Sequence, residues 1–306
     1  MAFTAKDVQT LRERTGCGMM DCKKALTETN GDMEKAIDVL REKGLAAAAK
    51  KSGRIAAEGV VCVMVEDGVA AIVEVNAETD FVAKNETFVA FANDIAKTVI
   101  SENPADVDAL MTMKLSGSDM TVEEALRDKI LVIGENMKIR RFERVEGDVV
   151  GYSHGGGRIG VLVKMELDGA AKGNAAALEA GKDVAMQIAA LNAPYLNKES
   201  VPAEVLESEK QITIAQFKND PKHANKPDQV LEKMVMGKMG KYFENNCVLC
   251  QAFVKDGDKT VSQYLADVSK EVGGKVDVVD FIRFEKGEGL EKKQDNFAEE
   301  VASMMK

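Results

Sequence analysis

Apolar residues recur at helical spacing in the first part of the chain and predict three short helices over residues 1–43, the third with an apolar stripe that ends at Leu40. Thr4 and Asp7 can cap the first helix reciprocally, and glycine-containing turns separate the three helices. We therefore expect a small three-helix N-terminal domain over 1–43. Residues 44–58 carry no apolar stripe, and we expect a helical or flexible linker there.

From Gly59 onward the apolar period changes from that of a helix to that of a strand. Two valine-rich runs flank a turn at residues 66–68 and predict a β-hairpin, which a helical pattern follows. The same order of strand, turn, strand and helix recurs from Gly147, about 88 residues further on. We interpret the recurrence as two related α+β core subdomains with antiparallel strands, at 59–140 and 141–284.

Three further segments complete the predicted α+β fold. Residues 121–138 have the pattern of one continuous helix. Residues 198–244 are polar and helical with a bend at 219–221, which predicts an inserted helical hairpin suited to forming a homodimer. The chain then closes with a strand at 248–254, further helix and strand, and a C-terminal module at 285–306 that includes a charged helix.

The charge and composition of the chain argue against several function classes. Lys and Arg number 41 against 51 Asp and Glu, and the net charge of −10 argues against broad binding to nucleic acid. No apolar run approaches the roughly 18 residues of a membrane span, and the N-terminus lacks the apolar core of a signal peptide. Five cysteines, an odd number in a chain of 306 residues, are typical of a reduced protein. We therefore expect a cytoplasmic protein with no nucleic-acid or membrane partner.

Gly155-Gly156-Gly157-Arg158-Ile159-Gly160 satisfies the spacing G-x-G-x-x-G. A dinucleotide site needs such a loop to open a helix, whose N-terminus binds the pyrophosphate. Here the loop opens a predicted strand, so a tight hairpin turn is the favoured interpretation. The alternative function that this motif leaves open is a nicotinamide-dependent oxidoreductase.

Cys247 and Cys250 have the spacing of a redox motif or of half a zinc site. No second pair of cysteines or cluster of histidines completes a zinc site, and no helix N-terminus is predicted to activate a thiol. In a strand over 248–254 the two thiols would point to nearly opposite faces. We favour a structural role, with a thiol or zinc protein as the alternative.

No group of side chains suited to bond-making chemistry is evident in the sequence. His154 and His223 lie alone in predicted turns, where a histidine is commonly a surface residue, although His154 could contact a partner. There is no Ser/His/Asp set, no Cys/His pair and no carboxylate cluster at ligand spacing. We therefore expect no enzyme activity, no cofactor and no metal site.

Two apolar features are unusual. Met19 and Met20 directly follow a glycine, and a three-helix bundle cannot bury both, so we expect one to be exposed. A loop after the second predicted strand sets an acidic residue beside a large aromatic, in the order Thr79, Asp80, Phe81, Val82. Taken alone, Phe81 is more typical of a side chain that caps the core than of one that contacts a partner.

Several of these segments together resemble one protein family. Residues 11–26 (LRERTGCGMMDCKKAL) closely resemble the N-terminal signature of translation elongation factor Ts, and residues 74–84 (EVNAETDFVAK) resemble its second signature. The similarity continues through 154–163 (HGGGRIGVLV) and 281–285 (FIRFE), so it covers nearly the whole chain in order. Ala77 and the two cysteines of the 247–250 motif depart from the family pattern without disturbing it.

The resemblance implies a guanine-nucleotide exchange factor for elongation factor Tu, without covalent chemistry of its own. It implies that the three-helix domain is ubiquitin-associated-like and that the loop from Thr79 to Val82 enters the partner's GTPase domain, displaces its magnesium and loosens its phosphate loop. The other partner-binding residues that it implies are Arg12, Met19 and Met20 in the N-terminal domain and His154 and Gly155 in the second core subdomain. The hairpin at 198–244 then corresponds to a dimerisation insertion.

Overall fold

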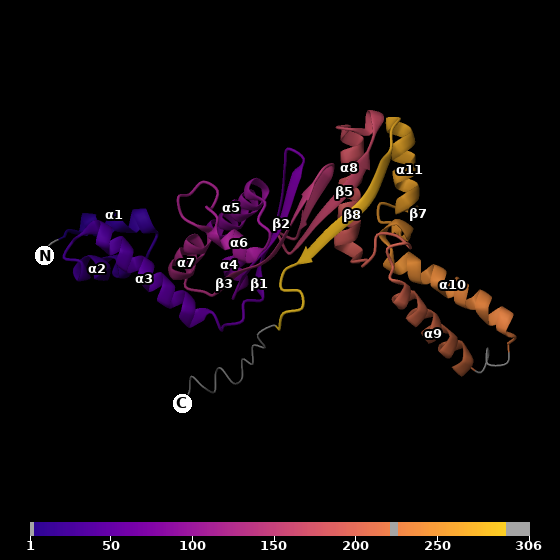
Figure 1. Ribbon diagram of the computed structural model, residues 1–306, viewed down its shortest axis with the longest axis horizontal. Coiled ribbons are helices and arrows are strands. Elements are labelled where there is room, and N and C mark those ends of the chain that lie inside the picture. Colours follow the sequence, from indigo (N-terminus) through magenta and orange to yellow (C-terminus); the bar gives the residue numbers. More distant parts are fainter. Residues whose placement is uncertain (1–2, 221–225, 292–306) are drawn as a thin grey trace. The chain divides into compact units, whose positions relative to one another are not determined.

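The computed structural model describes residues 3–220 and 226–291 and has an α+β fold (Figure 1). The chain divides into two compact units. The first consists of Met1–Arg144, Ser153–Gly160 and Phe284–Lys306, and the second of Val145–Tyr152 and Val161–Arg283. Apart from Glu291, the predicted charged helix of the C-terminal module lies outside the described residues. None of the helices in the described ranges is both long and apolar enough to cross a lipid bilayer.

The N-terminal helices of the first unit are α1 (Ala5–Thr15), α2 (Met19–Glu28) and α3 (Met33–Lys51). The predicted capping box of α1 is confirmed, because Thr4 accepts from the amide of Asp7 while Asp7 accepts from Thr4. The buried residues of this bundle form a cluster of their own, made of Val8, Leu11, Cys17, Cys22, Ala25, Leu26, Ala36 and Leu40.

Helix α3 continues through 44–51, so this part of the predicted linker is helical. It packs on α7 (Val122–Ile133) through Gly44, where a Cβ would lie 3.7 Å from the carbonyl oxygen of Arg127. Lys51 donates to the carbonyl of Ile130 at 3.3 Å. Contacts made by a glycine and a lysine leave no apolar stripe, which is why the hydropathy pattern did not reveal this packing.

The core of the first unit is a sheet in the order β1-β2-β3, made of β1 (Glu58–Glu66), β2 (Val69–Ala77) and β3 (Met137–Glu146). The predicted hairpin is confirmed, since β1 and β2 pair antiparallel up to Glu66 and Val69. Asp67 and Gly68 both have positive φ, as the tight turn requires. Three further helices in this unit are α4 (Asp80–Ala83), α5 (Glu86–Glu102) and α6 (Val107–Thr112).

The single helix predicted over 121–138 is wrong, because α7 ends at Ile133 and β3 begins at Met137. Gly134 adopts the left-handed conformation, with φ of 88°, and its amide closes the helix on the carbonyl of Ile130. The chain therefore turns at 134–136, and these residues take no part in the helix or in β3.

The second sheet has the order β4-β5-β8 and is built from β4 (Val149–His154), β5 (Ile159–Leu167) and β8 (Val276–Glu285). The short helix η1 (Gly169–Ala171) and then α8 (Ala175–Leu191) follow β5. The predicted recurrence of strand, turn, strand and helix is thus present in the order of elements.

The rest of the second unit is mainly helical. Helices α9 (Ala203–Asn219) and α10 (Asp228–Asn246) contact each other as the predicted hairpin (Figure 1). The strand predicted at 248–254 is wrong, because the chain there forms the 3-10 turn η2 (Val248–Cys250) and the two-residue strand β6 (Ala252–Phe253). Strand β7 (Asp256–Thr260) pairs with β6, and α11 (Val261–Val272) follows.

Candidate functional site

Phe81 is the most exposed large apolar side chain in the described part of the chain, at 81% of its full accessible area. It lies on the single-turn helix α4, directly after β2. The expectation that Phe81 caps the core is wrong, because its neighbours Val82 and Ala83 occupy the buried side of α4. A phenylalanine ring held this far into solvent would gain free energy if another surface buried it, so Phe81 marks a candidate site of interaction.

The loop that carries Phe81 is fixed by hydrogen bonds at its base. Thr79 is the N-cap of α4 and accepts from the amide of Val82, while its hydroxyl donates to Glu135 at 2.7 Å. Glu135 lies in the turn after α7 and also accepts from the amides of Glu78 and Thr79. Glu135 was not among the predicted site residues, because the apolar pattern of 121–138 predicted a continuous helix there. Gly134, a typical helix stop, was the signal that could have revealed the turn.

Asp80 is paired with Lys84 on the exposed side of α4, at 2.6 Å between carboxylate and ammonium. The hydrogen bond from Lys84 holds the pKa of Asp80 below its usual value, and the same bond raises the pKa of Lys84. The carboxylate beside Phe81 is therefore ionised at neutral pH and accessible to a partner's hydrogen-bond donors.

The strand that precedes the loop, β2, carries a fully buried carboxylate. Glu74 of β2 lies within 2.7 to 3.2 Å of its donors, which are Asn76, Arg140, Arg141 and the amide of Gly287. Burial raises the pKa of Glu74, but these hydrogen bonds together outweigh burial and leave the pKa below its ordinary value. A charged group is thus stable inside the first unit because these four residues donate hydrogen bonds to it.

The glycine-rich turn is explained by close packing on β1. The amide of Val61 donates to the carbonyl of Gly157 at 2.7 Å, and a Cβ on Gly160 would lie 2.5 Å from the nearest side-chain carbon of Val61. As predicted, the turn opens a strand, β5, so it lacks the helix N-terminus that a dinucleotide site requires.

His154 and Gly155 lie exposed at the start of this turn. The glycine-rich turn and α4 both contact β1. This strand therefore supports both His154 and Gly155 on the turn and Phe81 on α4.

Met19 and Met20 begin α2 and are both exposed, at 52% and 62% of full accessible area. One exposed methionine was expected. The buried face of α2 is filled by Cys22, Ala25 and Leu26, which leaves both methionines at the surface. Arg12 is exposed on α1 of the same bundle. All three residues are therefore accessible to a partner, on other elements than the one that carries Phe81.

Cys247 and Cys250 are free thiols at η2. Burial raises the pKa of Cys247 to about 11 and raises that of Cys250, so both are protonated at neutral pH and poor nucleophiles. Cys247 also donates to the carbonyl of Asn197 at 3.3 Å. Within residues 3–220 and 226–291, no group of three or more His, Cys, Asp or Glu is placed to hold a metal ion.

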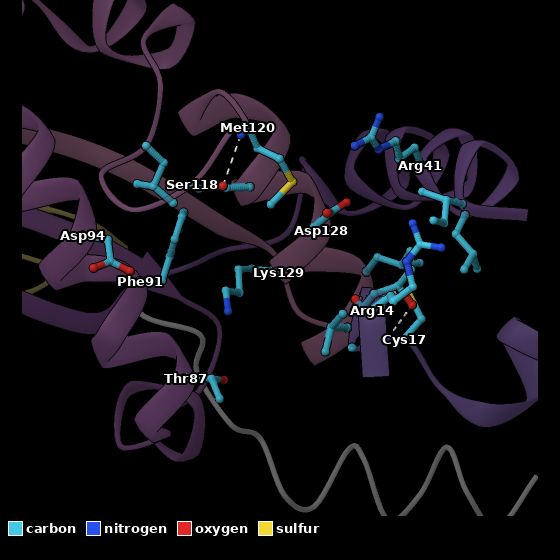
Figure 2. Close-up of a pocket in the computed structure, with 18 of the residues that line it drawn as sticks. Arg14, Cys17, Arg41, Thr87, Phe91, Asp94, Ser118, Met120, Asp128 and Lys129 are labelled. Carbon is cyan, nitrogen blue, oxygen red and sulfur yellow. Dashed lines mark hydrogen bonds between the residues drawn. The ribbon is translucent and has the colours of Figure 1, made fainter. Parts of the chain in front are cut away.

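A cavity of about 740 Å³ lies between the N-terminal helices and α5 and α7 (Figure 2). Charges of both signs line it, from Arg14, Arg41 and Lys129 to Asp94 and Asp128. Burial raises the pKa of Asp128 and favours its neutral form. Because the lining carries both positive and negative side chains, its charge does not favour either an anionic or a cationic ligand. Phe81 is not among the residues that line this cavity.

Comparison with known proteins points to one family. The family model described as Elongation factor TS matches residues 78–288. Elongation factor Ts of Clostridium perfringens strain SM101 is 55% identical over 307 residues, which cover 99% of this chain and 99% of the relative. Elongation factor Ts of Clostridium kluyveri strain ATCC 8527 is 52% identical over 98% of this chain and 97% of its own length. That of Clostridium botulinum strain Eklund 17B is 51% identical over 99% of this chain and 99% of its own length.

Proposed function

This chain belongs to the elongation factor Ts family, and on that premise we propose that it binds elongation factor Tu·GDP, disturbs the magnesium and phosphate site and so promotes GDP release. Family membership supports a nucleotide-exchange role in translation elongation, and the steps below are the mechanism that we propose for it. GTP then binds the emptied factor. The chain makes and breaks no covalent bond in this cycle. We expect the chain to be cytoplasmic, and the exchange reaction to take place in the cytoplasm.

The observation that carries the proposal is the exposed ring of Phe81 on a braced loop. A GTPase holds GDP through magnesium, backbone amides and a lysine, so release requires several contacts to be disturbed together. If the partner has a pocket for the ring only when its magnesium site is displaced, then burial of Phe81 favours that displaced state. The gain from burying the ring is thereby coupled to the loss of GDP.

Thr79, Asp80 and Val82 have distinct roles in this mechanism. Asp80 is exposed and charged, so it can compete for donors or shift the water shell around the metal. Val82 is buried and anchors α4 to the core, and Thr79 caps the helix. Phe81 is thus the residue that enters the partner, while Val82 and Thr79 hold it in place.

Two further surfaces complete the proposed contact with elongation factor Tu. The first is formed by Arg12, Met19 and Met20, whose exposed thioether chains suit an apolar patch on a partner. The second is the turn with His154 and Gly155. Because the chain carries a net charge of −10 and the nucleotide is anionic too, recognition rests on local apolar and polar contacts rather than on net attraction.

The hairpin within 198–244 is the proposed surface for homodimer formation. Leu231, Val235 and Met239 are buried in this hairpin, whereas Ile212 and Met236 are exposed. Exposed apolar side chains on a projecting helix pair suit a second copy of the same hairpin. Light scattering of the isolated protein tests this point, and a monomer at micromolar concentration would refute it.

The test of the proposed function is release of a fluorescent GDP analogue from elongation factor Tu. The factor is loaded with the analogue, mixed with excess unlabelled GDP, and followed with and without this chain. We expect a large acceleration of release that grows with the concentration of the chain. An unchanged release rate would refute the exchange function. Absorbance of bound cofactor at saturating NAD, and metal analysis, test the oxidoreductase and the zinc-protein alternatives.

A further inference from the structure

Two segments far apart in sequence bind each other's backbone at the start of the loop that carries Phe81. One is the pair Glu78 and Thr79 after β2, and the other is the pair Glu135 and Asn136 between α7 and β3. The carboxylate of Glu135 accepts from the amides of Glu78 and Thr79 at 3.1 and 3.0 Å. In return, the carboxylate of Glu78 accepts from the amide of Asn136 at 2.6 Å. We call these four residues the clasp.

Within the clasp, Glu135 satisfies three donors at once. One carboxylate oxygen accepts both amides, and the other accepts the hydroxyl of Thr79 at 2.7 Å. Hydrogen bonds to an ionised acceptor are stronger than those between neutral groups. Loss of Glu135 would leave three part-buried donors to find other partners, at the base of the helix turn that carries Phe81.

The other half of the clasp ties the loop to the segment after α3. Arg54 pairs with Glu78 at 3.4 Å, and the side chain of Asn136 donates to the carbonyl of Arg54 at 2.8 Å. Glu78 is therefore held by two donors, and the turn at 134–136 is held on both sides. The loop and the turn restrain each other, which leaves α4 few ways to move.

We propose that Glu135 is a positioning residue for Phe81, which holds α4 in the partner-ready geometry before elongation factor Tu arrives. This inference rests on the proposed exchange function. An exposed ring on an unrestrained loop would lose conformational freedom when it enters a partner, and that entropy loss would subtract from the binding that displaces GDP. A loop that is already ordered loses less, so more of the burial of Phe81 is available for the coupling.

Three single variants test the proposal, with GDP release measured over a range of exchange-factor concentrations. Glu135→Ala removes all three acceptor bonds and should reduce the acceleration about tenfold or more. Thr79→Val removes the hydroxyl at nearly constant volume, and with it both the bond to Glu135 and the cap on the amide of Val82. It should give a smaller loss than Glu135→Ala, whereas Thr79→Ser keeps the hydroxyl and both bonds and should stay within about twofold of the wild type. Glu143→Ala, an exposed carboxylate on β3, removes the same charge elsewhere and serves as the control.

A double variant separates positioning from general structural support. If Glu135 acts through Phe81, then Phe81→Ala/Glu135→Ala should release GDP no more slowly than Phe81→Ala alone. Additive losses would overturn the proposal. Hydrogen exchange of the free protein provides a readout that needs no partner, since the amides of Glu78 and Thr79 should exchange faster in Glu135→Ala while the thermal transition is retained.

The outcomes also distinguish this inference from the function on which it rests. No acceleration by the wild type would refute the exchange function itself. Full acceleration by a folded Glu135→Ala variant, or unchanged exchange of the two amides, would overturn the positioning role while the function stands. If Glu135→Ala does not fold, Thr79→Val and Thr79→Ser decide, and equal activity of these two would overturn the proposal.

Discussion

The backbone amide of Gly287 donates a 2.8 Å hydrogen bond to the fully buried carboxylate of Glu74. Strand β2 and the turn after β8 are thereby tied together, and Arg140 and Arg141 neutralise the charge. Removing one partner of a buried ion pair costs about 3–5 kcal/mol, because the other charges are left without compensation. We therefore expect Glu74→Ala to lower the free energy of unfolding by an amount of that order.

The pH dependence of unfolding tests this arrangement through Glu74→Gln. Although burial raises it, the hydrogen bonds to Glu74 hold its pKa in the folded chain below the ordinary value. Its charge therefore adds stability above its unfolded pKa, and that stability is lost as the pH falls through the lower folded pKa. In urea unfolding from pH 7 to pH 3, the wild type should lose more stability than Glu74→Gln. Parallel curves for the two proteins would contradict the role of the buried charge.

The second prediction concerns the close approach of the glycine-rich turn to β1. A Cβ on Gly160 would lie 2.5 and 2.7 Å from side-chain carbons of Val61 and Val63. Gly160→Ala should therefore destabilise the chain by about 1–3 kcal/mol, as overpacking commonly does. Gly237→Ala on α10, where a Cβ meets nothing within 4 Å, is the matched control and should be neutral or slightly stabilising. Equal urea midpoints for the two variants would contradict the close packing.

The third prediction is that the double variant Cys247→Ser/Cys250→Ser keeps nearly full exchange activity. Neither thiol has an activating neighbour, and the pKa of Cys247 is raised to about 11. In the wild type, both thiols should react slowly with a thiol reagent at pH 8, because little thiolate is present. A large loss of activity in a folded double variant, or rapid labelling of Cys247, would show that the thiols have a function.

The fourth prediction concerns Phe81 and Asp80. Phe81→Ala should weaken the coupled exchange equilibrium by about 2 kcal/mol or more, which is about thirtyfold. Asp80→Ala should cost less than about 1 kcal/mol, because its carboxylate is exposed. Stopped-flow GDP release measures both effects. Because the coupling between the two ligands is reciprocal, excess GDP should also dissociate the complex of this chain with elongation factor Tu. Since Phe81 is 81% exposed, its truncation should leave the melting temperature unchanged, and unchanged release from this folded variant would exclude the wedge mechanism.

The fifth prediction tests the domain boundary at residue 43. The buried cluster of the N-terminal helices lies wholly within 1–43, and the core of the β1-β2-β3 sheet is separate from it. A chain that lacks 1–43 should therefore unfold cooperatively, with a modest loss of stability where Leu131 becomes exposed, and it should bind elongation factor Tu more weakly. Calorimetry and a binding titration measure these effects. A truncated chain without a cooperative transition would place the boundary elsewhere.

The sequence by itself determined the elements whose signals are local. The capping pair Thr4 and Asp7, the Asp67–Gly68 turn and the valine-rich runs of β1 and β2 depend on neighbours within a few residues, and the structure has each of them as predicted. The family could also be recognised from the sequence, because each of its signatures is one continuous segment and does not depend on long-range contacts.

Only the tertiary structure decided the features that depend on distant contacts. Helix α3 extends to Lys51 because Gly44 fits against α7, and Phe81 is exposed because Val82 and Ala83 already fill the core side of α4. Glu135 meets Thr79 across 56 residues of chain. The pattern of one segment reveals its helix or strand propensity and the period of its apolar residues. The burial and hydrogen bonding of its side chains depend instead on which other segment packs against it. The residues beside Phe81 were therefore predictable from the chain, and the carboxylate that holds them was not.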